Sequence, residues 1–225
     1  MRQSPLAVTL LPLTSLDTTV LDQRPWHVRV AANGKAFVSL QGAVPGAYTL
    51  LEVDLGTGVQ RLRTDAGNAG NVAGGLLERS RDASYLAVNG GPGLFQSYDG
   101  ASDAFGPRES AIPYDWRPSV DATGQHVAIS LDIYDRTLQL VRRVHSPILF
   151  PGVVSSAFSG DGLHLYQGAG IYGIVRSRVS DGMMLDRSLS PVLPDLVRVS
   201  PDGTMLVIVN SICCGTSHIA VMDLR

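Results

Sequence analysis

The sequence predicts an all-β fold, a β-propeller of about five four-stranded blades. Short polar turns recur about every 40 residues along the chain, which is the period of a propeller blade. An apolar run ends at each turn and an alternating apolar run follows it, as expected for two strands joined by a hairpin. The 24 glycines and 13 prolines among 225 residues favour many short strands joined by tight turns. The five turns are Ala31-Ala32-Asn33-Gly34, Ser80-Arg81-Asp82-Ala83, Asp121-Ala122-Thr123-Gly124, Ser159-Gly160-Asp161-Gly162 and Ser200-Pro201-Asp202-Gly203.

Two columns of apolar residues accompany these turns. With the copies aligned on the turn glycine, or on Ala83 in the second copy, the third residue after it is always large and apolar. The fourth residue before it is apolar in every copy except the second, where Arg79 occurs. We expect both columns to pack between neighbouring blades, because one repeat cannot bury its own apolar face. The first column is Phe37, Leu86, Val127, Leu165 and Leu206, and the second is Val30, Val120, Phe158 and Val199.

The fifth copy reaches Arg225 after only three strands, so the ring needs one more strand to close. Strand-like segments at Leu6–Leu13 and Thr18–Leu21 precede the first copy, and one of them can serve as the outer strand of the last blade. The alternative is a fragment of a larger propeller, with about six to eight blades. Third and outer strands are expected at residues 50–55, 60–63, 138–141, 174–176, 184–188 and 219–224.

We therefore expect a single propeller domain over residues 1–225, in which residues 1–25 hold the closing strand and the lead-in. A chain of this length is long enough to bury a substantial core. The repeats are expected at about 26–65, 75–108, 116–145, 153–190 and 195–225.

Composition argues against several classes of protein. A net charge of −2 and a pI near 6.2 provide no basic surface for nucleic acid. The acids are 17 aspartates and three glutamates, which fits turn chemistry, because the Asp side chain bonds its own backbone. No apolar span is long enough for membrane insertion, and the start at Met1-Arg2-Gln3-Ser4-Pro5 lacks the features of a signal peptide. The adjacent Cys213 and Cys214 have neither disulfide-framework nor metal-ligand spacing.

The last repeat, Ser200-Pro201-Asp202-Gly203 with the apolar strand that follows it and the strand His218–Leu224, carries a family resemblance. It resembles the repeat of the YVTN-type and TolB-like propellers, which are WD-repeat-like, although the Gly-His and Trp-Asp marks of WD repeats are absent. The resemblance implies a bacterial propeller, often periplasmic or extracellular, that serves binding or scaffolding. It names no reaction, and the sequence itself leaves the compartment open.

The strand order predicts which rim of the propeller binds a partner. If each inner strand ends at its polar turn, all of these turns lie on one rim and the longer, more varied loops lie on the other. Binding residues concentrate on loops held by a rigid scaffold, and Tyr, Trp and Arg dominate interface energetics. Alternatively, the two tryptophans wedge between blades. The predicted rim-binding residues are Trp26, His27, Tyr114, Asp115, Trp116 and Arg117.

A second candidate site lies at the channel. Arg29, Glu78 and Arg198 share the fifth position before the turn residue, on inner strands next to the central channel. Such charges can bind an anion or a metal, or they can pair with one another. A glycosidase would instead need a second carboxylate near Glu78, for which Asp115, Asp132 and Asp195 are candidates that no motif distinguishes.

The leading functional hypothesis is a non-catalytic binding or scaffold domain that engages a protein, peptide or glycan through the long-loop rim, alone or within a larger bacterial protein. No cofactor, metal site, nucleic-acid partner or membrane insertion is expected. For a metal site, the five histidines are spread along the chain without ligand spacing. The alternative is a propeller enzyme of the glycoside hydrolase or lactonase type, with its site at the channel mouth.

Overall fold

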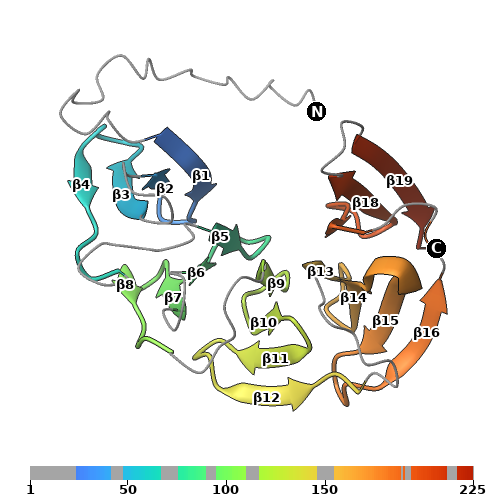
Figure 1. The fold of residues 1–225 in the computed structure, drawn as a ribbon. Helices are drawn as coiled ribbons and strands as arrows, with labels where there is room; N and C mark the ends of the chain where they lie inside the picture. The colour runs from blue at the N-terminus through green and yellow to red at the C-terminus, as the bar shows by residue number, and fades with distance from the viewer. Residues whose placement is uncertain are drawn as a thin grey trace, which may run out of the picture.

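A computed structural model of the chain contains five antiparallel sheets that follow one another around a centre (Figure 1). Within each sheet the first strand is innermost and the later strands step outward in chain order. This is the architecture of a β-propeller with five blades, and it confirms the predicted fold class. The structure describes residues 24–41, 48–66, 76–89, 95–109, 117–145, 155–188, 190, 194–211 and 217–224.

Four blades have four described strands and the fifth has three. Blade 1 contains β1 (Arg24–Val30), β2 (Lys35–Gln41), β3 (Tyr48–Asp54) and β4 (Gln60–Leu62), and blade 2 contains β5 (Leu76–Arg79), β6 (Tyr85–Asn89), β7 (Phe95–Asp99) and β8 (Ala104–Phe105). Blade 3 contains β9 (Ser119–Val120), β10 (His126–Ile129), β11 (Asp132–Asp135) and β12 (Leu140–Arg143). Blade 4 contains β13 (Ser155–Phe158), β14 (His164–Gly168), β15 (Ile174–Arg178) and β16 (Met184–Ser188), and blade 5 contains β17 (Leu196–Val199), β18 (Met205–Ser211) and β19 (Ser217–Asp223).

The five polar turns share one backbone conformation and lie on one rim. All five reference residues have left-handed φ angles, including Ala83 at +59°, although this region favours glycine. Turns of neighbouring blades bond to each other: the Ala32 N–H donates to the Ala83 carbonyl at 2.8 Å, and the Asp82 N–H donates to the Ala122 carbonyl at 3.2 Å. Each inner strand ends at this rim and therefore begins at the opposite rim.

The aspartates of these turns are used within the turns. In blades 2, 4 and 5 a serine hydroxyl donates to the turn aspartate two residues later, as Ser80 does to Asp82 at 2.6 Å. In blade 3 Asp121 takes the place of that serine and accepts from the backbone and the ring of His126, at 3.0 and 2.9 Å. These turn aspartates are thus hydrogen-bonded within their own turns.

The first apolar column forms the centre of the packing between blades, as predicted. Phe37, Leu86, Val127, Leu165 and Leu206 are each 0% exposed. They lie in four apolar clusters, one between each consecutive pair of blades along the chain. Burial of these residues supplies the cohesion that one blade cannot supply alone.

The prediction for the second apolar column holds at three of its four positions. Phe158 is buried between blades 3 and 4, and the half-buried Val120 and Val199 pack against the clusters between blades 2 and 3 and between blades 4 and 5. Val30 is the exception, with 38% of its surface exposed. These residues lie on inner strands and also line the central channel, so the column lies where the seams between blades meet the channel wall.

Blade 3 also departs from the sequence prediction. Its third strand is β11, not residues 138–141, because a tight turn at Ser130, with a left-handed φ of +56°, returns the chain at once. Leu138 lies in the next turn with φ +65°, and residues 140–143 form the outer strand β12. β11 begins and ends with an aspartate, Asp132 and Asp135, so its sequence does not show the apolar run that predicts a strand.

The outer edge of β19 has no strand partner among the described residues, whereas the third strand of every other blade pairs with a fourth. Ile219 and Val221 on β19 are 70% and 61% exposed. The predicted closing segments, Leu6–Leu13 and Thr18–Leu21, lie outside the described residues.

Candidate functional site

The inner strands bring Arg29, Glu78 and Arg198 together in the channel. Oε2 of Glu78 on β5 accepts hydrogen bonds from Nη2 of Arg29 on β1, at 3.2 Å, and from Nη2 of Arg198 on β17, at 3.1 Å. One carboxylate oxygen thus links the second blade to the first and to the fifth. The side chains keep 27%, 19% and 36% of their surface exposed, in chain order, so the cluster remains in contact with the channel.

Both arginines are also fixed to their own strands. Nη1 of Arg29 donates to the Val28 carbonyl at 2.9 Å, and Nη1 of Arg198 donates to the Val197 carbonyl at 3.1 Å. The backbone bonds hold each guanidinium in place independently of Glu78. The two cations are therefore positioned by the fold itself.

Two adjoining cavities, of about 630 Å³ and 150 Å³, form the channel around this cluster. Both are lined by Glu78 and Arg79 of β5, and by Arg81 of the turn that follows β5. The larger cavity adds Arg29 and the smaller adds Arg198. The described charged lining consists of four arginines and a single glutamate, which leaves an excess of positive charge.

Burial and nearby positive charges lower the pKa values of Arg198 and His27. Burial lowers the pKa of Arg198; Glu78 opposes the shift, while Arg29 and Arg117 add to it. Burial likewise lowers the pKa of His27, with further lowering from Arg29 and Arg117. The cationic forms of these groups are thus disfavoured by their surroundings, which is the condition that a bound anion relieves.

Of the predicted rim residues, the structure describes the side chains of two. His27 lies on β1, half-buried, and its backbone N–H donates to Oγ of Ser39 at 3.1 Å. Arg117 lies just before β9 and is exposed. Tyr114, Asp115 and Trp116 lie outside the described residues, as does the side chain of Trp26.

The carboxylate pair of a glycosidase is not assembled by Glu78 and Asp132. Asp132 lies on β11, two strands out from the inner strand of its blade, and Arg143 of β12 binds both of its oxygens at 2.7 and 3.0 Å. Asp195 precedes β17, where its backbone N–H donates to the Val209 carbonyl. The third candidate, Asp115, lies outside the described residues.

Within the described part of the chain, no group of three or more His, Cys, Asp and Glu side chains is placed to hold a metal ion. Cys213 and Cys214 fall outside it. The same residues include no helix of the length and apolarity that a membrane crossing needs.

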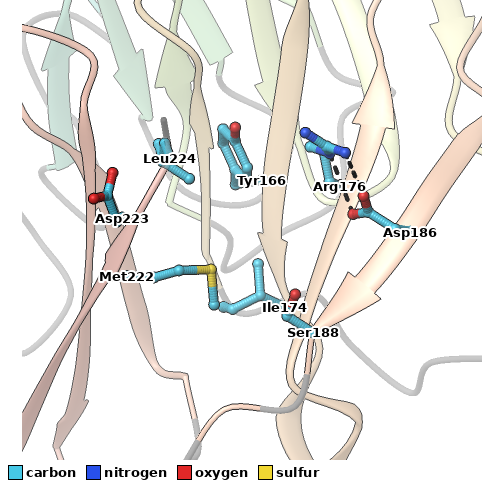
Figure 2. Close-up of a pocket in the computed structure, with 8 residues that line it drawn as sticks. All are labelled: Tyr166, Ile174, Arg176, Asp186, Ser188, Met222, Asp223 and Leu224. Carbon is cyan, nitrogen blue, oxygen red and sulfur yellow. Dashed lines mark hydrogen bonds and ion pairs between the residues drawn. The ribbon is translucent and has the colours of Figure 1, made fainter.

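Another hollow, of about 210 Å³, lies between blades 4 and 5 (Figure 2). Met222 of β19 and Ile174 of β15 extend toward one another across it, and Tyr166 lies nearby (Figure 2). The charged residue on its far side, Arg176, is already paired with Asp186 of β16. Since its apolar residues belong to the cluster between these blades, the hollow is the outer end of a packing seam.

A second ionic cluster joins blades 1 and 2, and the sequence analysis missed it. Arg63 is 4% exposed and donates to Glu52, Asp65 and Asp103, at distances from 2.5 to 2.9 Å. Its guanidinium also lies 4.9 to 5.9 Å from the ring centres of Phe37, Tyr98 and Phe105. Lys35 and Arg61 complete the set, so three cations face three carboxylates.

The sequence analysis also missed Arg79 and Arg81 as channel residues. The available signal was the break in the second apolar column, where Arg79 replaces an apolar residue. If this column is assigned to the channel wall, Arg79 predicts that the wall is charged.

Comparison with known proteins supports the fold and leaves the function open. No protein-family model matches the chain, and no curated protein matches its sequence. Among solved structures, 1057 chains match, so the likeness selects no single function. One is hydrazine synthase from Kuenenia stuttgartiensis, with a TM-score of 0.51 and 16% identity. The match covers 65% of this chain and 45% of that one, so the chain spans less than half of that protein's length.

Proposed function

We propose that this chain is a non-catalytic binding or scaffold domain that engages a protein, peptide or glycan through its long-loop rim. We also propose that it belongs with the YVTN-type and TolB-like propellers that its last repeat resembles. The observation that carries the binding role is the rigid five-blade frame, whose neighbouring turns bond along one rim. Such a frame leaves the opposite loops free to present side chains.

The position of Arg117 supports this choice of rim. It lies two residues before β9, and it is close enough to His27, in the middle of β1, to lower the pKa of that histidine. Aromatic and Arg side chains grouped in this way supply most of the energy of protein interfaces. Trp26 directly precedes His27 and Trp116 directly precedes Arg117, so we expect the two tryptophans to belong to the same surface.

Intrinsic fluorescence tests the proposal, because Trp26 and Trp116 are the two tryptophans of the chain. Ligands found on peptide and glycan arrays should shift the tryptophan emission as they bind. The double substitution Trp116→Ala/Arg117→Ala should weaken binding about a hundredfold, as expected for two interface anchors. Arg178→Ala, which alters an exposed ion pair beside the turn of β15 and β16, is the matched control and should leave binding unchanged.

Array ligands that bind without moving the emission, and that tolerate the double substitution, would place the binding surface elsewhere. Each variant must keep the wild-type melting temperature for the comparison to count.

A further inference from the structure

The geometry points to a second, separate site: the central channel binds a small oxyanion with two or more negative charges, of the phosphate or dicarboxylate class, between Arg29 and Arg198. Glu78 is the internal counter-ion that this ligand displaces. The inference goes beyond the proposed rim surface, because it concerns different residues and a different class of ligand.

The donors of the two arginines are incompletely used. Both guanidiniums share one oxygen of Glu78 and each spends one further bond on its own strand, although a guanidinium carries five N–H donors. Elsewhere in this protein a single Arg binds both oxygens of one carboxylate, as Arg143 does with Asp132. That forked geometry is the stronger one, and a ligand oxyanion between the two arginines can form it.

The charge of the channel favours an anion. Arg79 and Arg81 line the same cavities as Arg29 and Arg198, and Glu78 is the one carboxylate among the described lining residues. The nearest turn acids are engaged elsewhere: Asp82 accepts from Ser80 and Ser84, and Asp202 accepts from Ser200 and Thr204. A ligand with two or three negative charges would match the remaining excess.

The size of the channel limits the ligand. The larger cavity, about 630 Å³, falls within the range of small-molecule sites. Its walls include Val28, Val30 and Val199, so a ligand with a short carbon skeleton gains apolar contacts beside the charged groups. Phosphate and a short dicarboxylate share the required chemistry, and the experiment separates them.

Calorimetric titration with inorganic phosphate and with succinate, at constant ionic strength, tests this site. We expect the wild-type chain to bind at least one of them saturably at one site, and the better probe identifies the class of ligand. Arg29→Gln/Arg198→Gln should weaken binding by about tenfold or more. Glu78→Gln should strengthen binding several-fold, because it removes the competing carboxylate. Arg143→Gln, on an outer strand, is the control and should bind like the wild type.

Absence of saturable binding of both probes to the wild-type chain would overturn the inference, and this result needs no variant. The inference would also be overturned if Arg143→Gln weakened binding as much as Arg29→Gln/Arg198→Gln does. Equal weakening would mean that the probe responds to the overall charge of the protein and not to the channel. If Glu78→Gln does not fold, Arg198→Lys replaces it: the charge is kept, the fork is lost, and weaker binding is expected. Trp116→Ala/Arg117→Ala should still bind phosphate or succinate, although Arg117 is near enough to Arg198 to alter the affinity. Loss of rim binding and loss of channel binding can therefore be distinguished.

Discussion

The two ionic clusters of this protein contain similar residues but differ in charge balance and in burial. Between blades 1 and 2, three cations face three carboxylates, and Arg63 and Glu52 at the centre are 4% and 3% exposed. In the channel, four arginines line the cavities with Glu78, and the side chains of the central trio are 19% to 36% exposed. The matched set, whose centre is buried, pairs its charges within the fold, whereas the unmatched set in the channel keeps an excess of positive charge that we propose an anion neutralises.

The first prediction breaks the matched cluster. Arg63→Met should lower the free energy of unfolding by about 3 kcal/mol or more, because it leaves the buried Glu52 carboxylate without its buried partner. The loss of the guanidinium from among Phe37, Tyr98 and Phe105 adds to this cost. Urea unfolding of the two proteins measures the difference.

Arg178→Met is the control for this experiment. It removes an arginine from an ion pair with Asp181 in which both side chains are exposed, by 50% and 39%, and such pairs contribute about 0 to 1 kcal/mol. Equal costs for the two substitutions would show that the buried cluster has no special structural role.

The second prediction compares one glutamate from each cluster. Glu78→Gln should cost about 1 to 2 kcal/mol in low-salt buffer, because like charges then face each other in a partly screened channel. Added phosphate should recover that stability. Glu52→Gln should cost more, and phosphate should not recover it, since the cations of that cluster keep Asp65 and Asp103 as partners.

Thermal melts with and without phosphate measure both effects in the second prediction. Recovery by phosphate in Glu52→Gln and not in Glu78→Gln would reverse our assignment of structural and binding roles.

The third prediction concerns acid, and it should be the smallest effect. Burial would raise the pKa of Asp103, but hydrogen bonds from Lys35, Tyr98 and Arg63 hold it well below its ordinary value. A carboxylate with a lowered folded-state pKa stabilises the fold above its unfolded pKa, near 4, and loses that contribution as the pH falls further. Stability should therefore decrease below about pH 4, and Asp103→Asn should flatten that decrease.

The third measurement is the urea midpoint at neutral and acid pH for the wild type and for Asp103→Asn. Because the Asp103 side chain is 36% exposed, solvent screening reduces the effect. Parallel profiles for the two proteins would contradict the assignment.

Repetition explains what the sequence could predict. A position that recurs in five blades has similar surroundings in most of them, so aligning Phe37 with Leu206 predicted burial at both, and aligning Arg29 with Arg198 predicted that both line the channel. The conformation of Ala83, left-handed without glycine, shows that the repeat constrains even a departing copy.

What repetition could not predict depends on contacts made by one pair of blades. Arg63 and Asp103 are 40 residues apart and have no counterparts in the other copies, so no column of the alignment marks them. The early turn at Ser130 is likewise particular to blade 3. The identity of a rim ligand depends on side chains such as Trp116, whose repeat position indicates a rim but not a partner.

The link through Glu78 has a consequence for the order of folding. Its two hydrogen bonds span 49 and 120 residues of sequence, so the carboxylate meets both arginines only after all five blades have assembled. Contacts of such long range form late, because the loop-closure entropy must be lost before they contribute. We therefore expect these contacts at the channel to form late in folding, and we expect an anion bound there to slow unfolding.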